Sequence, residues 1–405
     1  MALKGNLLVG QSGGPTAVIN ASLAGVIAEA KKHAEIGDIY GMANGVQGLL
    51  QEHIVDLRGE DDETISLLDH TPAAALGSCR KKLTDADYER LLQIFRAHQI
   101  RYLFYIGGND SADTSHRIGR VAAQAGWEMR VVGIPKTVDN DLFGTDHTPG
   151  YPSAARYVAL SVQQGGLLAR DMQKVDQFTI YQAVGRDSGW LAAGAVAAKR
   201  DEQDPPHIIL MPERAFDKEK FLAKVEQCYK KYGYCSISTG EGVSYADGTP
   251  ISASQTADKF GNVEFGAMGG TSAAMMLHRM ISDKFSSWRG EFQVVESLQM
   301  CGSDRVSALD VEEAYACGMR AVELAGQGET GLMVSIRRGS DKHGHYRTEL
   351  GTAPLADVAV KAKPMPDEYI DESGMFVTQA FIDYLRPLVG PVPEMAKLAY
   401  KPVKK

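Results

Sequence analysis

Short apolar runs alternate with longer segments of helical period along most of this chain. Each apolar run is short enough for a strand, and the segments between them repeat apolar residues every three or four positions. Such alternation predicts a mostly parallel sheet flanked by helices. The predicted strands lie at 6–9, 101–106, 130–134, 178–184, 208–211, 234–238 and 331–336. The predicted helices lie at 16–32, from 107–111 to about 124, at 154–169, from 185–189 to about 199, and at 217–232, 271–285 and 310–325.

The length of 405 residues exceeds the size at which one hydrophobic core usually stops growing, so two domains are predicted. The sequence contains no internal repeat and no obvious linker, which favours two domains that exchange segments. We expect residues 1–147 and about 266–310 in the first domain, and residues 148–265 and about 311–390 in the second. The lysine-rich residues 391–405 are predicted to form a surface tail.

Bulk composition limits the possible partners. The net charge of −8 and the pI near 5.7 argue against nucleic-acid binding, which needs a basic face. No apolar stretch approaches the length of a membrane span, and the apolar run near Met1 is too short for a secretion signal. Five cysteines fall at no metal-ligand spacing, which predicts reduced thiols and a cytoplasmic location.

The segment from Ile134 to Asp141, with the sequence IPKTVDND, carries the densest group of reactive side chains. It follows a predicted strand, and open α/β sheets bind ligands at the carboxyl ends of their strands. Lys136 can hold phosphate oxygens, and Asp139 can accept a proton from an attacking hydroxyl. The alternative is an Asx-rich turn that only starts the next element.

Two glycine-rich loops support a phosphate site. Residues 12–15 and 107–111 each connect a strand to a helix, where glycine and the helix N-terminus favour an anion. Asn109 and Asp110 could bind Mg²⁺, or Asp110 could only cap its helix. The basic run at 77–82 supplies Arg80, which can fork onto a phosphate; taken alone, such a run is more often solvated surface. The chain has no P-loop motif.

Taken together, these segments resemble the phosphofructokinase family over nearly the whole chain. The matching motifs are SGG-x-x-A-x-IN at 12–20, GSCR at 77–80, GG-N-DS at 107–111, PKT-V-DND at 135–141, GR-x-x-GW at 185–190 and GEG at 240–242. The resemblance implies two Rossmann-like three-layer domains with the active site in the cleft between them. The chain is similar to the pyrophosphate-dependent members, which reversibly phosphorylate the 1-hydroxyl of fructose 6-phosphate in glycolysis with Mg²⁺.

The resemblance also implies roles for individual residues. Asp110 stands where ATP-using members have glycine, and Lys136 stands where they have a small residue, so both positions imply pyrophosphate as the donor. The implied catalytic residues are Asp139 as general base with Lys136, Asp110 and Thr137. Pyrophosphate would bind Gly13, Gly14, Arg80, Gly108 and Lys136. The sugar would bind Thr137, Val138, Asp139, Val184, Gly185, Arg186, Glu241, Ser297, Gln299 and Met300. The metal would bind Asn109 or Asp110.

The predicted sugar pocket departs from the family pattern. Many members have an arginine that binds the sugar 6-phosphate where this chain has Met300, and Gln177 replaces a second cation. Arg289, Arg305 or Lys174 could compensate, and we favour compensation by Arg289 and Arg305. Alternatively, the acceptor is another sugar, sugar phosphate or polyol.

The sequence disfavours two other functional classes. A catalytically idle subunit that senses sugar phosphate is disfavoured by the retained Asp139, Lys136, Arg80 and Asp110. An NAD-dependent oxidoreductase is disfavoured because no G-x-G-x-x-G opens the first helix. The resemblance implies a homodimer or homotetramer.

Overall fold

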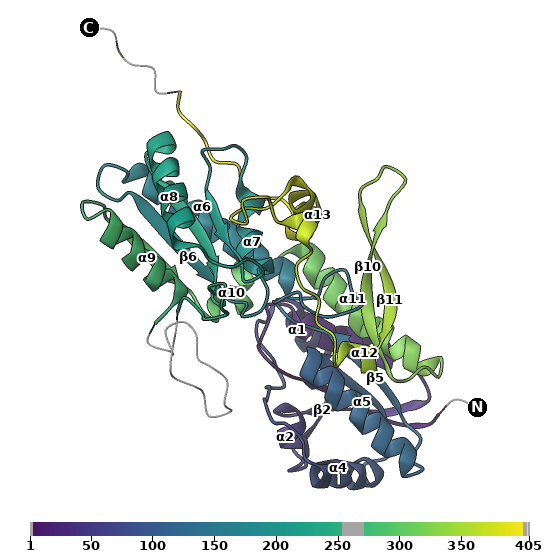
Figure 1. The fold of residues 1–405 in the computed structure, drawn as a ribbon. Coiled ribbons are helices and arrows are strands. Elements are labelled where there is room, and N and C mark those ends of the chain that lie inside the picture. The colour runs from purple at the N-terminus through teal and green to yellow at the C-terminus, as the bar shows by residue number, and fades with distance from the viewer. Residues whose placement is uncertain (1–2, 253–270, 400–402, 404–405) are drawn as a thin grey trace.

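The computed structural model describes residues 3–252, 271–399 and 403, which form two α/β units, each built on one sheet (Figure 1). The sheets are mostly parallel, which confirms the predicted fold class. In the first sheet the strands lie in the order β11 (Tyr346–Pro354), β10 (Leu332–Ser340), β5 (Arg130–Pro135), β4 (Ile100–Gly107), β1 (Gly5–Gln11), β2 (Ile36–Met42) and β3 (Ile54–Asp56). In the second sheet they lie in the order β7 (Ile208–Leu210), β8 (Cys235–Gly240), β6 (Phe178–Ala183) and β9 (Gly290–Val294).

Alternate residues of the central strands enter two separate cores, one on each face of the first sheet. Leu7 and Phe104 pack toward one face, whereas Leu8 and Tyr105 pack toward the other. The helices on the first face are α1 (Ile19–Ala30) and α11 (Ala308–Gly326). The helices on the second face are α2 (Gly45–Leu49), α4 (Asp85–Ala97), α5 (Asn109–Gln124) and α12 (Leu355–Val358). This period-two alternation is why a strand with apolar residues on both faces must be central in the sheet.

The second sheet is covered in the same way. One face packs against α6 (Tyr151–Asp171) and α7 (Trp190–Gly194), and α13 (Gln379–Val389) packs against α6 in the same core. The other face packs against α8 (Lys218–Tyr232) and α9 (Ala273–Lys284). Shorter elements are α3 (Asp62–Leu67), α10 (Leu298–Cys301) and the 3₁₀ turns η1 (Leu68–His70), η2 (Ala195–Ala198), η4 (Ser303–Arg305) and η5 (Asp367–Tyr369).

The two units exchange segments, but in the opposite order to the one expected. The expected assignment of 266–310 to the first domain is wrong for its described part, 271–310, because β9 pairs with β6 in the second sheet. Residues 266–270 lie outside the described residues. The assignment of 311–390 to the second domain is wrong in part, because β10 pairs with β5 in the first sheet. The predicted strands do not include β9, because its sequence GEFQV mixes polar with apolar residues and is exposed or partly exposed.

Helices α1 and α11 cross closely, so the segment that contains α11 and β10 packs against the N-terminal unit. A Cβ atom at Gly25 would stand 2.1 Å from the carbonyl oxygen of Tyr315, and one at Gly318 would stand 2.1 Å from that of Ser22. Glycine at both positions is what allows the two backbones to approach.

Most of residues 392–399 are exposed, and the start of this segment is attached to the second unit. Arg156 and Gln163 on α6 donate to the carbonyl oxygens of Pro391 and Pro393, and Val392 is buried. All five cysteines are free. Among the described residues, no helix is long and apolar enough to cross a membrane.

Candidate functional site

The three loops singled out in the sequence meet at one edge of the first sheet. They follow β1, β4 and β5, which are neighbours in the sheet and parallel. Backbone hydrogen bonds join the loops: the N–H of Ser12 donates to Ile106, and the N–H of Lys136 donates to Gly107, at 2.9 and 3.1 Å. The carboxyl ends of adjacent parallel strands therefore bring residues 12–15, 107–111 and 136–141 together.

Lys136 extends from the end of β5 into the glycine loop that follows β1. Its ammonium nitrogen donates to the carbonyl oxygen of Gly14 at 2.8 Å, and the side chain is only 4% exposed. Gly13 has a φ of 77°, and a Cβ there would stand 3.1 Å from the same nitrogen. Burial lowers the pKa of Lys136 to about 8, against the opposing effect of nearby Asp139. The amine is thus a charge held inside the glycine loop that the sequence predicts to bind phosphate.

Asp139 lies three residues beyond Lys136 and is partly buried. Burial raises the pKa of Asp139 to about 6, and the negative charge of Asp141 raises it further, while Lys136 opposes both. The backbone on either side is fixed: the Asp139 N–H donates to the Thr137 hydroxyl at 3.1 Å, and the Ser188 hydroxyl donates to the Asp139 carbonyl at 3.0 Å. A carboxylate with a near-neutral pKa is suited to accept a proton.

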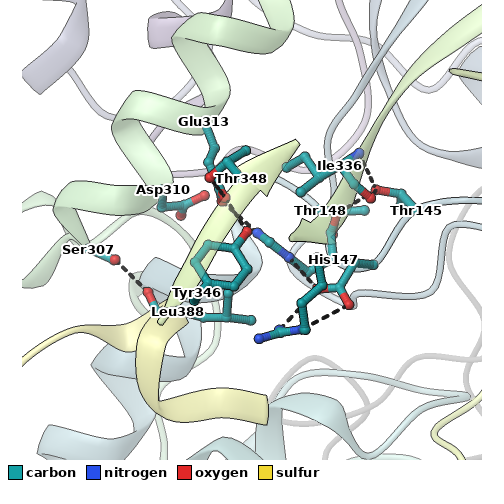
Figure 2. Close-up of polar contacts among 12 residues, drawn as sticks. Thr145, His147, Thr148, Ser307, Asp310, Glu313, Ile336, Tyr346, Thr348 and Leu388 are labelled. Atoms are coloured by element: carbon teal, nitrogen blue, oxygen red, sulfur yellow. Dashed lines mark hydrogen bonds and ion pairs between the residues drawn. The ribbon is translucent and has the colours of Figure 1, made fainter. Parts of the chain in front are cut away.

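Residues after Asp141 anchor this segment in a buried polar network, which Figure 2 shows around His147. The fully buried imidazole of His147 lies between two carboxylates, at 2.9 Å from Asp146 and 2.5 Å from Glu313 of α11. Glu313 also accepts from the hydroxyls of Tyr346 and Thr348 on β11. Burial opposes protonation of His147, but the hydrogen bonds to the two carboxylates raise its pKa overall. No sequence pattern predicts this anchor, because its members are far apart in the chain.

The loop that carries Arg80 is attached to the glycine loop after β1. The Ser78 hydroxyl donates to the carbonyl of Gly13 at 2.6 Å, and Asn20 on α1 donates to the carbonyls of Thr71 and Ala73. Arg80 itself is exposed, and its positive charge contributes to the lowered pKa of Lys136. The structure therefore brings Arg80, Gly13, Gly14 and Lys136 into one neighbourhood.

The two residues predicted to bind metal behave differently. Asn109 uses its amide nitrogen to donate to the carbonyls of Val358 and Lys361, at 3.0 and 3.1 Å, and so holds the end of α12. Asp110 is exposed in the first turn of α5, directly after Gly108. Within the described ranges, no group of three or more His, Cys, Asp or Glu residues is arranged to bind a metal.

The second unit contributes the residues predicted to bind the sugar. Glu241 follows β8 and accepts from the backbone N–H of Gly185 at 3.3 Å, and burial raises its pKa to about 7. Exposed Arg186 lies close enough for its charge to lower the pKa of both Glu241 and Asp139. Arg186 and Glu241 of the second unit therefore lie near Asp139 of the first.

Helix α10 completes this side of the site. Gln299 is buried and accepts from the Val184 N–H at 3.1 Å, which fixes the turn before Arg186. The Met300 sulfur would be 3.9 Å from a Cβ at Gly14, so Met300 stands against the glycine loop of the first unit. Ser297 is exposed at the start of the helix, and Val138 is buried in the core beside α6.

The structure separates Arg289 from the other predicted sugar ligands. Arg289 directly precedes β9, which is parallel to β6, so it lies at the amino end of the sheet with Gln177. The strand β6 separates this end from Val184 by about 20 Å. The predicted role of Arg289 in the sugar pocket of its own chain is therefore wrong. The guanidinium of Arg305 donates to the Ser161 hydroxyl at 2.9 Å and lies over the ring of Tyr157, both on α6.

The chain is similar to known proteins over most of its length. The model of the family described as phosphofructokinase matches residues 6–325. A pyrophosphate–fructose 6-phosphate 1-phosphotransferase of Halomonas elongata is 40% identical over 97% of this chain and 96% of its own length. A sulfofructose kinase of Alkalicoccus urumqiensis is 34% identical over 90% of this chain and 91% of its own. The crystal structure of a pyrophosphate-dependent phosphofructokinase from Nitrosospira multiformis has a TM-score of 0.87 and 38% identity, and covers 98% of this chain and 95% of that chain.

Proposed function

Because this chain belongs to the phosphofructokinase family, we propose that it transfers a phosphoryl group reversibly between pyrophosphate and the 1-hydroxyl of fructose 6-phosphate. The products are fructose 1,6-bisphosphate and phosphate, as in glycolysis. One observation carries the proposal most directly: Lys136 and Asp139 lie in one anchored segment at the carboxyl edge of the first sheet, with pKa values moved toward neutrality from opposite sides.

In the proposed reaction, the C1 hydroxyl oxygen attacks a phosphorus atom of pyrophosphate and its proton passes to Asp139. The bond from that phosphorus to the bridging oxygen breaks, and the second phosphate leaves. Lys136 and Arg80 stabilise the phosphoryl oxygens as charge develops on the leaving group. Thr137 and the N–H groups near Gly14 and Gly108 position the donor.

Pyrophosphate rather than ATP is supported by the positions of Asp110 and Lys136. Asp110 lies after Gly108 at the start of α5, where its charge and bulk disfavour the additional phosphate of a nucleotide. The Lys136 ammonium occupies the space beside Gly13 and Gly14. With both side chains in place, the remaining space suits pyrophosphate, which has two phosphate groups.

The residues present fit a site in which Mg²⁺ is held partly by the donor. Asp110 offers an exposed carboxylate, whereas the Asn109 amide is engaged by α12. Mg²⁺ usually keeps several waters and binds one or two carboxylates together with phosphate oxygens. We therefore assign the metal contact to Asp110, and bound Mg²⁺ would neutralise charge on the pyrophosphate.

A second acceptor class is favoured by Met300. Met300 lies against Gly14 and cannot bind a phosphate, and Arg289 lies at the far end of β6. A relative with 34% identity is named a sulfofructose kinase, so near relatives of this chain have different named acceptors. The same transfer onto a fructose that carries another group at C6 is the second candidate.

A homodimer or homotetramer stays a prediction. The side chain of Arg289 is 76% exposed at the amino end of the second sheet, so a substrate that it contacts would be bound in the site of another subunit. Light scattering on the purified protein measures the subunit number directly.

The proposed function is tested by following ³¹P resonances of pyrophosphate, sugar phosphate and phosphate with Mg²⁺ present. Conversion of pyrophosphate and fructose 6-phosphate, without comparable conversion of ATP, supports both donor and acceptor. Turnover of pyrophosphate only with a C6-sulfonated or unphosphorylated sugar favours the second candidate. No turnover with any of these acceptors would contradict the proposal.

A further inference from the structure

A lysine outside the recognised motifs binds the segment that carries Asp139. Lys363 lies beyond α12, and its backbone N–H donates to the Asp141 carbonyl at 2.7 Å. Its ammonium nitrogen lies 3.2 Å from the Asn140 side-chain oxygen, 3.2 Å from the Thr145 carbonyl and 2.7 Å from the Asp146 carbonyl. An ammonium has three N–H donors, so these three oxygens match its full capacity.

The residue that Lys363 reaches, Asn140, stands between the two aspartates. Asn140 is fully buried and has a φ of 56°, in the left-handed region that a non-glycine residue seldom adopts. Its side-chain oxygen also accepts from the Thr148 N–H, and its amide nitrogen donates to the Tyr384 hydroxyl at 3.1 Å. The unusual backbone is thus held through a side chain that bonds Thr148, Tyr384 and Lys363.

Hydrogen bonds connect Asn140, Tyr384, the Asp146 carbonyl and Lys363 in a closed ring. The Tyr384 hydroxyl, which accepts from Asn140, donates in turn to the Asp146 carbonyl at 3.0 Å, the same oxygen that Lys363 binds. The Lys363 ammonium also lies 5.1 Å from the ring centre of Trp190. Both Lys363 and Tyr384 lie after the segment that the family model matches, which ends at residue 325.

We propose that Lys363 is a positioning residue for phosphoryl transfer, which fixes the turn at Asn140 and thereby aims the Asp139 carboxylate at the acceptor hydroxyl. This rests on the proposed function, since Asp139 is the base only in that reaction. The ammonium itself does not contact substrate; it acts by holding three oxygens of the segment 140–146. A positive charge beside Asp141 also lowers that carboxyl's pKa, although burial raises it overall.

The first experiment compares Lys363→Met with Lys363→Arg and with Lys342→Met. Lys342 lies in the exposed turn between β10 and β11, so its substitution removes the same charge without touching the segment. We expect Lys363→Met to lower kcat by about 10- to 100-fold with less than about threefold change in the KM for pyrophosphate, since misplacing a reacting group chiefly slows chemistry. Lys363→Arg should recover most of the loss, and Lys342→Met should match the wild type. Unchanged kcat in Lys363→Met, or an equal loss in Lys363→Arg, would overturn the proposal.

A second measurement separates this proposal from the proposed function. Hydrogen–deuterium exchange should show faster exchange at residues 137–148 in Lys363→Met, with unchanged exchange in β6 and β8. This readout needs no turnover, so it holds even if fructose 6-phosphate is not the acceptor. Unaltered exchange at 137–148 would show that Lys363 does not hold the segment. Faster exchange throughout the chain would mean a general loss of stability and would also contradict a positioning role.

Discussion

The ammonium nitrogen of Lys136 lies 2.8 Å from the carbonyl oxygen of Gly14, so the side chain after β5 closes over the glycine loop after β1. A phosphate group that entered this loop would meet a fixed charge rather than a mobile one. The contact also keeps the amine buried, and burial lowers the pKa of Lys136 to about 8. The donor site and the pH response of the enzyme are therefore linked through one residue.

Replacing the base should remove most activity. In Asp139→Asn the side chain keeps its size but cannot take the hydroxyl proton, so kcat should fall by about 10²- to 10⁴-fold. Asp113→Asn, on the exposed surface of α5, provides the matched control. Both variants should have the same thermal unfolding midpoint as the wild type. Activity of Asp139→Asn close to that of the control would show that another group accepts the proton.

The pH dependence should be bell-shaped. Asp139 must be ionised to act as base, so kcat/KM should fall as pH decreases through about 6. Lys136 must be protonated to stabilise phosphoryl oxygens, so kcat/KM should fall again as pH increases through about 8. Titration of both substrates by ³¹P resonance identifies any limb that belongs to them. A profile with no acid limb beyond the substrate's own titration would contradict the role of Asp139.

The donor preference should respond to two substitutions together. Asp110→Gly with Lys136→Gly opens the space beside Gly108 and Gly13, and the ratio of kcat/KM for ATP to that for pyrophosphate should rise by about a hundredfold or more. The two single variants show whether either position is sufficient. If pyrophosphate use falls in the double variant while ATP use does not rise relative to it, the account of donor choice fails.

Met300 tests the acceptor. Met300→Arg places a cation beside Gly14, and a charge-assisted hydrogen bond to a sugar phosphate would lower the KM for fructose 6-phosphate about tenfold or more. Met300→Leu conserves volume and should leave that KM unchanged. The expected selectivity is for phosphorylated over unphosphorylated acceptors. An equal change in KM for both acceptor types would show that the effect comes from packing.

The buried His147 should contribute strongly to stability. His147→Leu leaves Glu313 and Asp146 without their shared partner, at a cost of about 3–5 kcal/mol in the free energy of unfolding. Because the pKa of His147 is raised on folding, its contribution is complete below its unfolded pKa and is lost as pH rises through the folded one. The control is His33→Ala, which removes a partly exposed histidine between two glutamates and should cost about 1 kcal/mol or less. Denaturant unfolding at several pH values measures both; equal losses would refute a special role for the buried site.

The sequence was sufficient to predict that the loops of the proposed donor site meet, since each follows an apolar strand and parallel strands end at a common edge. It was insufficient for Arg289, because Arg289 and Met300 are near each other in sequence although β9 separates them: Arg289 precedes β9 and Met300 follows it. A residue before a parallel strand faces the opposite edge from a residue after it. Lys363 and Tyr384 belong to no motif, and only the packing of distant segments brings them to Asn140.

The pairing of β10 with β5 bears on how the chain is made. During synthesis, β5 leaves the ribosome long before residue 332. Until then β5 is an edge strand without its partner β10, and the face of the sheet that α11 covers is exposed to water. The apolar surface of α1 around Gly25 also stays exposed until α11 has been synthesised. Nascent chains of this protein therefore pass through a long aggregation-prone interval, and their dependence on chaperones should end only when the strands at 332–354 have left the exit tunnel.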